Sequence, residues 1–365
     1  MKKSVKKVAS ILIMALFGGV IGYSGSYLIG SNRLSIWDAV IFLFALLVSF
    51  NLHVIIHEAG HGIFGKLSGY KMVSYRIFSF MWIWQKDGKV VLRRFKVPGT
   101  LGQCLMAPPP YVKGKFPFRL YLLGGVLANL ITSSIVGMLF LPDSMIAAAF
   151  FITGMFIVIT NGFPIGFNDG MTLKIASSSE EQQYLLYVQF ETNYQLNQGK
   201  TYLDLPENFF QVATTNTKQT YLNDYQYFLR LARFSEKHDW RHLNDQIEAL
   251  WDQLDLLPPP YQIEVKKELL FSLAITKPED ERISQLWSDK KVQLSLKQPL
   301  MGNKRIKASY YYFIEHDLKK ALEYLKVGKN LVDKAPNSGD AKAEMTLNDW
   351  LQEQILLEYD VQTKL

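Results

Sequence analysis

Residues 39–64 read AVIFLFALLVSFNLHVIIHEAGHGIF, and this stretch decides the fold. Glu58 is its only Asp, Glu, Lys or Arg residue, and the run can cross the roughly 30 Å hydrocarbon core of a bilayer as one helix. An ionisable residue inside such a span is costly and needs a reason to persist. The stretch therefore predicts a membrane helix that carries a functional group. The alternative is a helix whose polar residues only pair with neighbouring helices.

Three further runs lack Asp, Glu, Lys and Arg: Val8–Asn32, Leu120–Pro142 and Ser144–Asn168. Each has about 20 residues or more, the length of a membrane-spanning helix. A cleavable signal peptide is the alternative for the first run, because the small residues 24–26 lie near its end. The sequence therefore predicts a polytopic α-helical membrane protein with about four transmembrane helices.

Charge divides the chain into two parts. Of its 365 residues, 48% are hydrophobic, and the formal net charge is +7. Residues 1–179 contribute a net charge of +12, and residues 180–365 contribute −5. We therefore expect an integral membrane domain over residues 1–176 and a soluble, all-α domain over residues 177–365. The single cysteine, Cys104, excludes a disulfide-stapled secreted module, and the apolar content excludes a disordered chain.

Basic residues predict how the chain crosses the membrane. Residues 1–7 include four lysines, and residues 71–119 hold ten Lys or Arg but only one acid, Asp87. The loop around Asp143 has no basic residue. Because basic loops stay in the cytoplasm, we expect a multi-pass protein of the cell membrane with its N-terminus and C-terminal domain in the cytoplasm. The positive charge is explained by this orientation, so no nucleic-acid partner is expected.

Residues 57–61, HEAGH, form an H-E-x-x-H motif. Side chains at i and i+4 share one helix face, so both imidazoles can ligate one zinc ion with the glutamate beside it. His53 lies on the same stripe, but about 12 Å from His61 along the axis, which is too far for one zinc ion. No other histidine lies in the membrane half, so we expect a carboxylate as the third ligand.

Asp169 is the acidic residue best placed to be that ligand. It lies at the cytoplasmic end of the last apolar run, on the same side as the H-E-x-x-H motif, whereas Asp38 and Asp143 are expected at the outer side. Pro164 precedes it and lacks a backbone N–H, so we expect a broken helix that opens a polar cavity at this depth. The alternative is a plain turn that ends the helix.

Together these motifs resemble the site-2 protease family of intramembrane zinc metalloproteases, over about residues 35–175. A G-x-x-x-N segment from Gly125 to Asn129 is similar too, although Gly124 and Gly125 stand where many members have Gly-Pro. The C-terminal half is outside the resemblance. The residues that match the family's paired motifs are His57, Glu58, His61, Asn161, Pro164, Asp169 and Gly170.

The resemblance implies a zinc ion (Zn2+) held by His57, His61 and Asp169. It implies Glu58 as the general base that activates water, which agrees with the chemistry of the motif. The expected activity is hydrolysis of a peptide bond near the cytoplasmic face, and the expected partners are the lipid bilayer and a membrane-embedded peptide or single-span protein as substrate.

Asn129 and Asn161 are candidates for binding the substrate backbone or the developing oxyanion. Hydrogen bonds between helices are an equally good explanation of either residue. A non-proteolytic, zinc-containing membrane scaffold that acts through its C-terminal helices is the alternative for the whole chain, although a scaffold has no need of Glu58.

Residues 73–97 are rich in aromatic side chains and contain Asp87-Gly88, which predicts a β-hairpin at the cytoplasmic membrane interface. An edge strand near the zinc ion would hold an unwound substrate by strand addition, and an anchor in the lipid interface is the alternative. Residues 102–110 are expected to form a constrained loop, with Cys104 as a packing residue.

The C-terminal half shows helical periodicity with breaks at residues 258–260 and 297–303. Residues 308–325 resemble a tetratricopeptide helical hairpin, and residues 234–251 look like an earlier relative, so we expect a short array of hairpins spaced by about forty residues. A plain helical bundle is the alternative. Either form would bind a cytoplasmic protein partner. The histidines of this half are interpreted as surface or hairpin residues: His238, His242 and His316.

Overall fold

The computed structural model describes residues 35–85, 87–95, 100–141, 144–211 and 219–362. These residues divide into two compact units, each of which is described by itself. The first takes in the described residues of 1–64 and 119–173, and the second takes in those of 65–118 and 174–365. By their contacts, residues 65–118 thus belong with the C-terminal helices.

Long helices build the first unit, and a short helix, α5 (Asp169–Ala176), follows them. Within the described part of the chain, three helices are long and apolar enough to cross a membrane. Of the four spans expected from the sequence, the first, Val8–Asn32, lies outside the described residues. The three that the structure contains are α2 (Ile36–Leu67), α3 (Phe118–Phe140) and α4 (Met145–Gly162).

The outer faces of these helices are apolar, as expected for a surface that lies in lipid. Their polar side chains are buried instead, which is where a membrane protein places groups that need partners. Apolar side chains that are more than half exposed include Trp37, Leu43, Phe44, Met138 and Ile159. Buried polar side chains include Ser49, His53, Asn129, Ser133 and Thr153.

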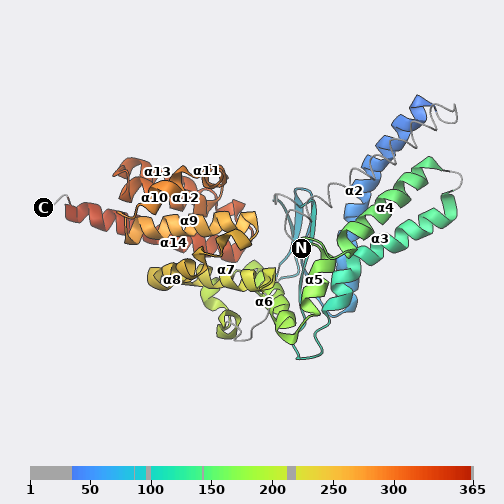
Figure 1. The fold of residues 1–365 in the computed structure, drawn as a ribbon, viewed down its shortest axis with the longest axis horizontal. Coiled ribbons are helices and arrows are strands. Elements are labelled where there is room, and N and C mark those ends of the chain that lie inside the picture. Colours follow the sequence, from blue (N-terminus) through green and yellow to red (C-terminus); the bar gives the residue numbers. More distant parts are fainter. Residues whose placement is uncertain (1–34, 86, 96–99, 142–143, 212–218, 363–365) are drawn as a thin grey trace. The chain divides into compact units, whose positions relative to one another are not determined.

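Glycines set the spacing between the helices. A β-carbon added at Gly60 would lie 2.4 Å from the carbonyl oxygen of Gly124, so the backbones of α2 and α3 touch at this point. A β-carbon added at Gly137 would lie 2.7 Å from the Phe151 ring, where α3 and α4 run side by side (Figure 1). Small residues permit such close packing between membrane helices.

The second unit opens with an antiparallel sheet in the order β3-β2-β1-β4. Its strands are β1 (Lys71–Ile77), β2 (Phe80–Trp84), β3 (Val90–Arg94) and β4 (Gly102–Ala107). The hairpin expected around Asp87-Gly88 is confirmed, because β2 pairs with β3 and Gly88 donates its N–H to the carbonyl oxygen of Gln85 at 3.0 Å. Gly88 has a φ of +80°, a conformation that glycine adopts without strain.

Residues 102–107 form a strand and not the loop that we expected from the sequence. β4 pairs with β1, with Tyr75 opposite Cys104 in the register, and it packs against helix α6 (Glu180–Asn197). Cys104 and Met106 point into the core, with 7% and 0% exposed. The interpretation of Cys104 as a packing residue is therefore confirmed.

Helices fill the rest of the second unit, as predicted. α9 begins at Pro259, where the missing N–H of proline costs nothing because the first turn of a helix has no use for it. The first expected break coincides with the start of α9, and the second covers the link from α11 into the first residues of α12. Besides α6, the helices are α7 (Tyr221–Glu236), α8 (Trp240–Trp251), α9 (Pro259–Thr276), α10 (Arg282–Ser288), α11 (Lys290–Leu296), α12 (Met301–Phe313), α13 (Leu318–Lys329) and α14 (Ser338–Gln362). Short 3₁₀ turns lie at Tyr202–Asp204, Glu207–Phe210, Leu254–Leu256 and Val332–Lys334.

Consecutive helices pack in pairs: α7 with α8, α9 with α10, and α12 with α13. His238 and His316 lie in the turns of the first and last pairs, with positive φ angles of 56° and 54°. The residues that follow, Asp239 and Asp317, each accept a backbone N–H three residues further on and so cap the second helix. The interpretation of His238 and His316 as hairpin residues is confirmed, while the tetratricopeptide likeness stays a prediction.

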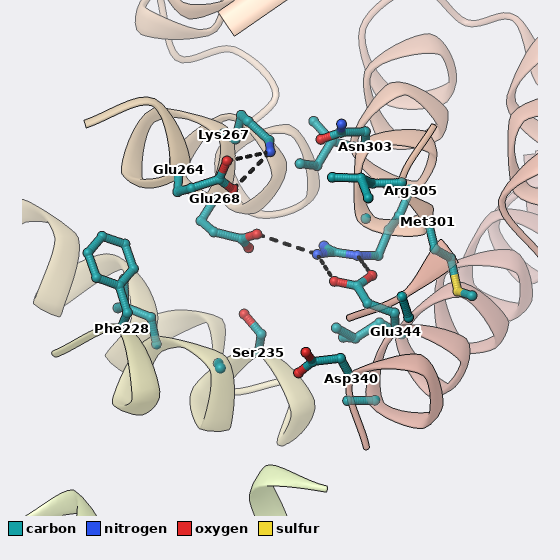
Figure 2. Close-up of a pocket in the computed structure, with 18 of the residues that line it drawn as sticks. Phe228, Ser235, Glu264, Lys267, Glu268, Met301, Asn303, Arg305, Asp340 and Glu344 are labelled. Atoms are coloured by element: carbon teal, nitrogen blue, oxygen red, sulfur yellow. Dashed lines mark hydrogen bonds and ion pairs between the residues drawn. The ribbon is translucent and has the colours of Figure 1, made fainter. Parts of the chain in front are cut away.

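An ion-pair network joins three helices of this array around a pocket of about 350 Å³. Arg305 on α12 is 1% exposed, and its Nε lies 3.0 Å from Glu344 on α14 (Figure 2). Its Nη2 lies 3.5 Å from Glu268 on α9, and the Phe271 ring packs 4.0 Å from the guanidinium carbon. Burial raises the pKa of the Glu268 carboxyl above its ordinary value, against the opposing effect of Arg305.

Candidate metal centre

Helix α2 carries three of the predicted site residues. His57 and His61 lie four residues apart, and their Nε2 atoms are 3.2 Å from each other. Only 9% of His57 and 8% of His61 is exposed. Glu58 follows His57 in the chain and is half-buried. The helix thus brings the two imidazoles together, as the spacing of the motif predicts.

Asp169 lies beside the two imidazoles, although it comes from the last residues of the first unit. It is the first residue of α5, and its Oδ2 lies 3.0 Å from His57 Nε2 and 3.3 Å from His61 Nε2. Across the described residues, these three side chains are the group that could hold a metal ion. The structure therefore assembles the three predicted ligands, although His57 and Asp169 are 112 residues apart in sequence.

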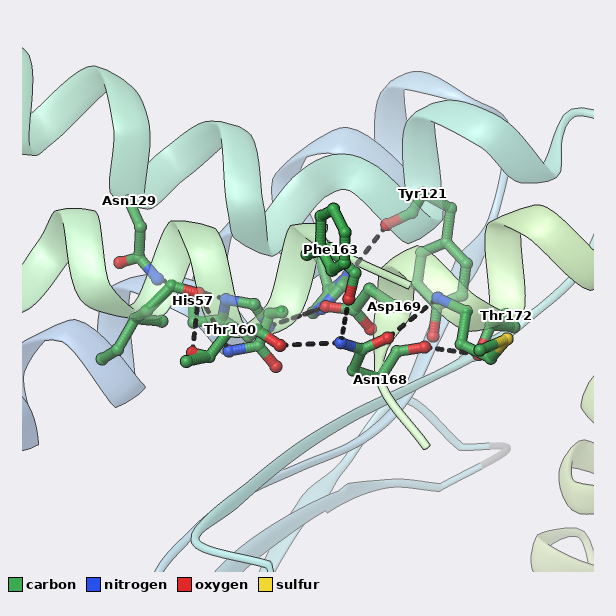
Figure 3. A network of polar contacts seen from close by, with 12 residues as sticks. His57, Tyr121, Asn129, Thr160, Phe163, Asn168, Asp169 and Thr172 are labelled. Carbon is green, nitrogen blue, oxygen red and sulfur yellow. Dashed lines mark hydrogen bonds and ion pairs between the residues drawn. The ribbon is translucent and has the colours of Figure 1, made fainter. Parts of the chain in front are cut away.

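The backbone between α4 and α5 is irregular, as Pro164 predicts. α4 ends at Gly162, and Asn168 links the two helices across the break (Figure 3). The side-chain amide of Asn168 donates to two carbonyl oxygens at the end of α4, at 2.7 and 2.6 Å. Its side-chain oxygen accepts the N–H of Met171 at 2.8 Å, in the first turn of α5. Asn168 thereby fixes the position of Asp169, which is the next residue.

Two glycines leave room for the ligands. A β-carbon at Gly125 on α3 would lie 2.6 Å from Cε1 and Nε2 of His57, which is far inside van der Waals contact. A β-carbon at Gly170 would lie 2.1 Å from the carbonyl oxygen of Gly162, so α5 can approach the end of α4 only through a glycine. Both glycines belong to the motifs picked out in the sequence.

The three ligand atoms fit a tetrahedral zinc ion. Zinc bonds of about 2.0–2.1 Å place two ligand atoms of a tetrahedron about 3.3 Å apart. The distances among the two nitrogens and the oxygen are 3.0, 3.2 and 3.3 Å. Two imidazoles and one carboxylate are also a ligand set that leaves a fourth position open in catalytic zinc sites. Other divalent ions that bind imidazole and carboxylate suit the same three atoms.

The second nitrogen of each ligand histidine is also engaged. His61 Nδ1 donates to the carbonyl oxygen of Tyr121 at 2.8 Å (Figure 3). His57 Nδ1 lies 3.1 Å from the side-chain nitrogen of Asn129, which is completely buried. Metal-binding histidines are commonly oriented by a partner at this nitrogen. Tyr121 could not be found from the sequence, because any residue type can supply a backbone carbonyl.

Two other polar residues of these helices hydrogen-bond to backbone carbonyls of α4. His53 Nε2 lies 3.0 Å from the carbonyl oxygen of Phe150 on α4, and the ring is completely buried. The side-chain amide of Asn161 donates to the carbonyl oxygen of Ile157, one turn earlier in its own helix, at 3.1 Å. The expected roles of Asn161 in substrate binding or between helices stay predictions.

The likeness to the site-2 protease family is carried by the motif residues of the sequence and stays a prediction. No protein-family model, curated protein or solved structure matches this chain.

Proposed function

We propose that this protein is an intramembrane zinc metalloprotease, similar to the site-2 proteases, that hydrolyses a peptide bond in a membrane-embedded substrate. The observation that supports the proposal is the meeting of His57, His61 and Asp169 beside Glu58, at helices long and apolar enough to span a membrane. Buried ionisable groups gathered inside apolar helices are costly, so they are kept where they serve a function.

Each residue has a distinct role in this proposal. His57, His61 and Asp169 hold the ion, which supplies Lewis-acid polarisation of the scissile carbonyl. Glu58 accepts a proton from the attacking water and passes it to the leaving amine. Asn161, close to the chain break at the end of α4, is the amide proposed to hold a substrate carbonyl.

The proposed setting is the cell membrane, with the N-terminus and the C-terminal helices in the cytoplasm. The ten basic residues of 71–119 support this orientation. The helical pairs α7–α8, α9–α10 and α12–α13 then offer a surface to a cytoplasmic protein partner, in the manner of tetratricopeptide arrays. This orientation places the proposed cleavage near the cytoplasmic face.

The test compares the wild type with Glu58→Gln, which keeps the size of the side chain but removes its basicity. We expect Glu58→Gln to retain zinc, because Glu58 is not a ligand, and to lose cleavage by a factor of at least about 100. Membrane proteomics of cells that express either protein should then show a small membrane peptide or single-span protein that accumulates only with Glu58→Gln.

Two results would contradict the proposal. If gently purified wild type contains no zinc by elemental analysis, the three side chains are a polar cluster without a metal. If zinc is present but the membrane peptides of the two strains are identical, the protein acts as a zinc-containing scaffold through its C-terminal helices. Pull-down of the same partner by both proteins would favour the scaffold further.

A further inference from the structure

A chain of hydrogen bonds runs from α4 through α2 and α3 to the ligand His57. The Phe150 carbonyl oxygen lies 3.0 Å from His53 Nε2, and His53 Nδ1 lies 2.9 Å from Asn129 Oδ1. The Nδ2 of the same amide lies 3.1 Å from His57 Nδ1. His53 and Asn129 are both 0% exposed, so water cannot take over either contact.

The Phe150 carbonyl at one end of this chain decides which atom donates and which accepts in each of its hydrogen bonds. The Phe150 carbonyl can only accept, so His53 Nε2 must carry a hydrogen. A neutral imidazole then has a lone pair at Nδ1, and a charged one at this depth would be costly. His53 Nδ1 therefore accepts a hydrogen bond, and the group that faces it is the carboxamide of Asn129.

The two ends of a carboxamide are nearly equal in shape, so the hydrogen bonds decide which end faces which ring. Turning the carboxamide by 180° from the assignment given above puts its NH₂ toward His53 Nδ1 and its oxygen toward His57 Nδ1, which must then carry the hydrogen. The lone pair of His57 is left on Nε2, the atom that lies 3.0 Å from Asp169 Oδ2 and 3.2 Å from His61 Nε2. Only in this tautomer can Nε2 bind a metal ion.

We propose that Asn129, held by His53, is a positioning residue that fixes the metal-binding tautomer of His57. The inference rests on the metal centre of the proposed function. His61 needs no such residue, since the backbone carbonyl of Tyr121 fixes its tautomer. In this arrangement both ends of the Asn129 carboxamide are occupied by histidines, so Asn129 supports the metal rather than contacting substrate.

The experiment measures zinc affinity by competition with a chelator, on full-length protein purified in detergent. Asn129→Leu keeps the volume but offers no acceptor, and we expect zinc affinity to fall by about 10- to 100-fold. Asn129→Asp keeps an oxygen for His57 Nδ1–H, and we expect zinc affinity within a few-fold of the wild type. Ser133→Ala is the matched control, because Ser133 is equally buried one turn further along α3.

His53→Phe tests the second link of the chain. Phenylalanine preserves the ring contact with Phe150, whose centroid lies 4.1 Å from that of His53, but it leaves the Asn129 amide without its orienting partner. We expect His53→Phe to lower the zinc affinity of the otherwise wild-type protein. Added to Asn129→Leu, His53→Phe should cause no further change in zinc affinity. This variant also covers the case in which Asn129→Leu does not fold.

The outcomes separate this inference from the proposed function. A wild type without zinc overturns both. If the wild type binds zinc and the folded Asn129→Leu binds it equally well, the positioning role is wrong while the metal centre stands. Should that variant bind zinc normally but lose cleavage, Asn129 contacts substrate instead, which also overturns the positioning role.

Discussion

At the residue scale, the His57 ring has room beside α3 because Gly125 has no β-carbon. The ring packs against the α3 backbone on one side, and its two nitrogens contact Asn129 and Asp169. A β-carbon at Gly125 would lie 2.6 Å from two ring atoms, and the partners of both nitrogens leave the ring no free direction in which to move.

We therefore expect Gly125→Ala to weaken zinc affinity by about tenfold or more, because the displaced ring misdirects Nε2. Gly162→Ala is the control, because its β-carbon would lie 3.4 Å from a methyl carbon of Val126, which is ordinary van der Waals contact. Chelator competition on both purified variants checks this. Equal zinc affinity in the two variants would show that the His57 ring has room to shift.

Residue type predicted the ligands but not the residues that hold them. His57 and His61 could be found from helical spacing, and Asp169 from its depth in the membrane. The linking role of Asn168 depends on where the end of α4 lies relative to α5, which only the tertiary path decides. Its sequence signal is the preference of asparagine for the position just before a helix.

At the scale of elements, backbone strain can be tested in the turns of the helical pairs that contain His238 and His316. His316 has a φ of 54° and is exposed, so its side chain adds strain at this position. We expect His316→Gly to raise the free energy of unfolding by about 0.5–1 kcal/mol, the strain removed less the greater entropy of an unfolded glycine. Thermal unfolding of the purified protein measures the change.

His238→Gly is the comparison variant. His238 has the same backbone conformation, but its ring stacks on Trp350 with centroids 4.7 Å apart. Loss of this stacking, worth about 0.5–1.5 kcal/mol, should cancel the gain. If both glycine variants destabilise the protein alike, the positive φ angles carry no strain.

Elements with their own periodicity were predicted well, and those defined by a partner were not. α2, α3 and α4 follow from long apolar runs, and the β2–β3 hairpin follows from its turn. β4 was missed because a short segment such as Gly102–Ala107 becomes a strand only through its pairing with β1. The pairs α7–α8 and α12–α13 could be expected from the hairpin-like segments 234–251 and 308–325. No such segment indicated the packing of α9 with α10.

At the scale of the whole molecule, orientation in the membrane is the property to measure. In a Cys104→Ala background, Ser35→Cys and Lys291→Cys each place one thiol at an exposed position. Because basic segments stay in the cytoplasm, we expect a membrane-impermeant maleimide to label Ser35→Cys in intact cells and Lys291→Cys only after permeabilisation. The reverse pattern would place the C-terminal helices outside the cell.

The charge distribution predicted that the chain has two parts. It could not predict which part residues 65–118 pack against. Residues 65–118 are basic like the membrane half, yet their contacts are with the C-terminal helices. The Phe116 ring, for example, lies with its centroid 5.8 Å from that of Tyr187 on α6. Such aromatic packing between distant positions leaves no periodic pattern in the sequence.

The separation of Asp169 from His57 by 112 residues has a mechanical consequence. An ion bound to both would act as a cross-link that closes a long loop, and closing a long loop removes much of the freedom of the unfolded chain. α2 and α3 touch through their own backbones at Gly60 and Gly124 and need no such cross-link. Stripping the ion should therefore loosen the α5 end first, because the hydrogen bonds of Asn168 to the end of α4 are then what holds Asp169 near the histidines, while α2 and α3 stay packed.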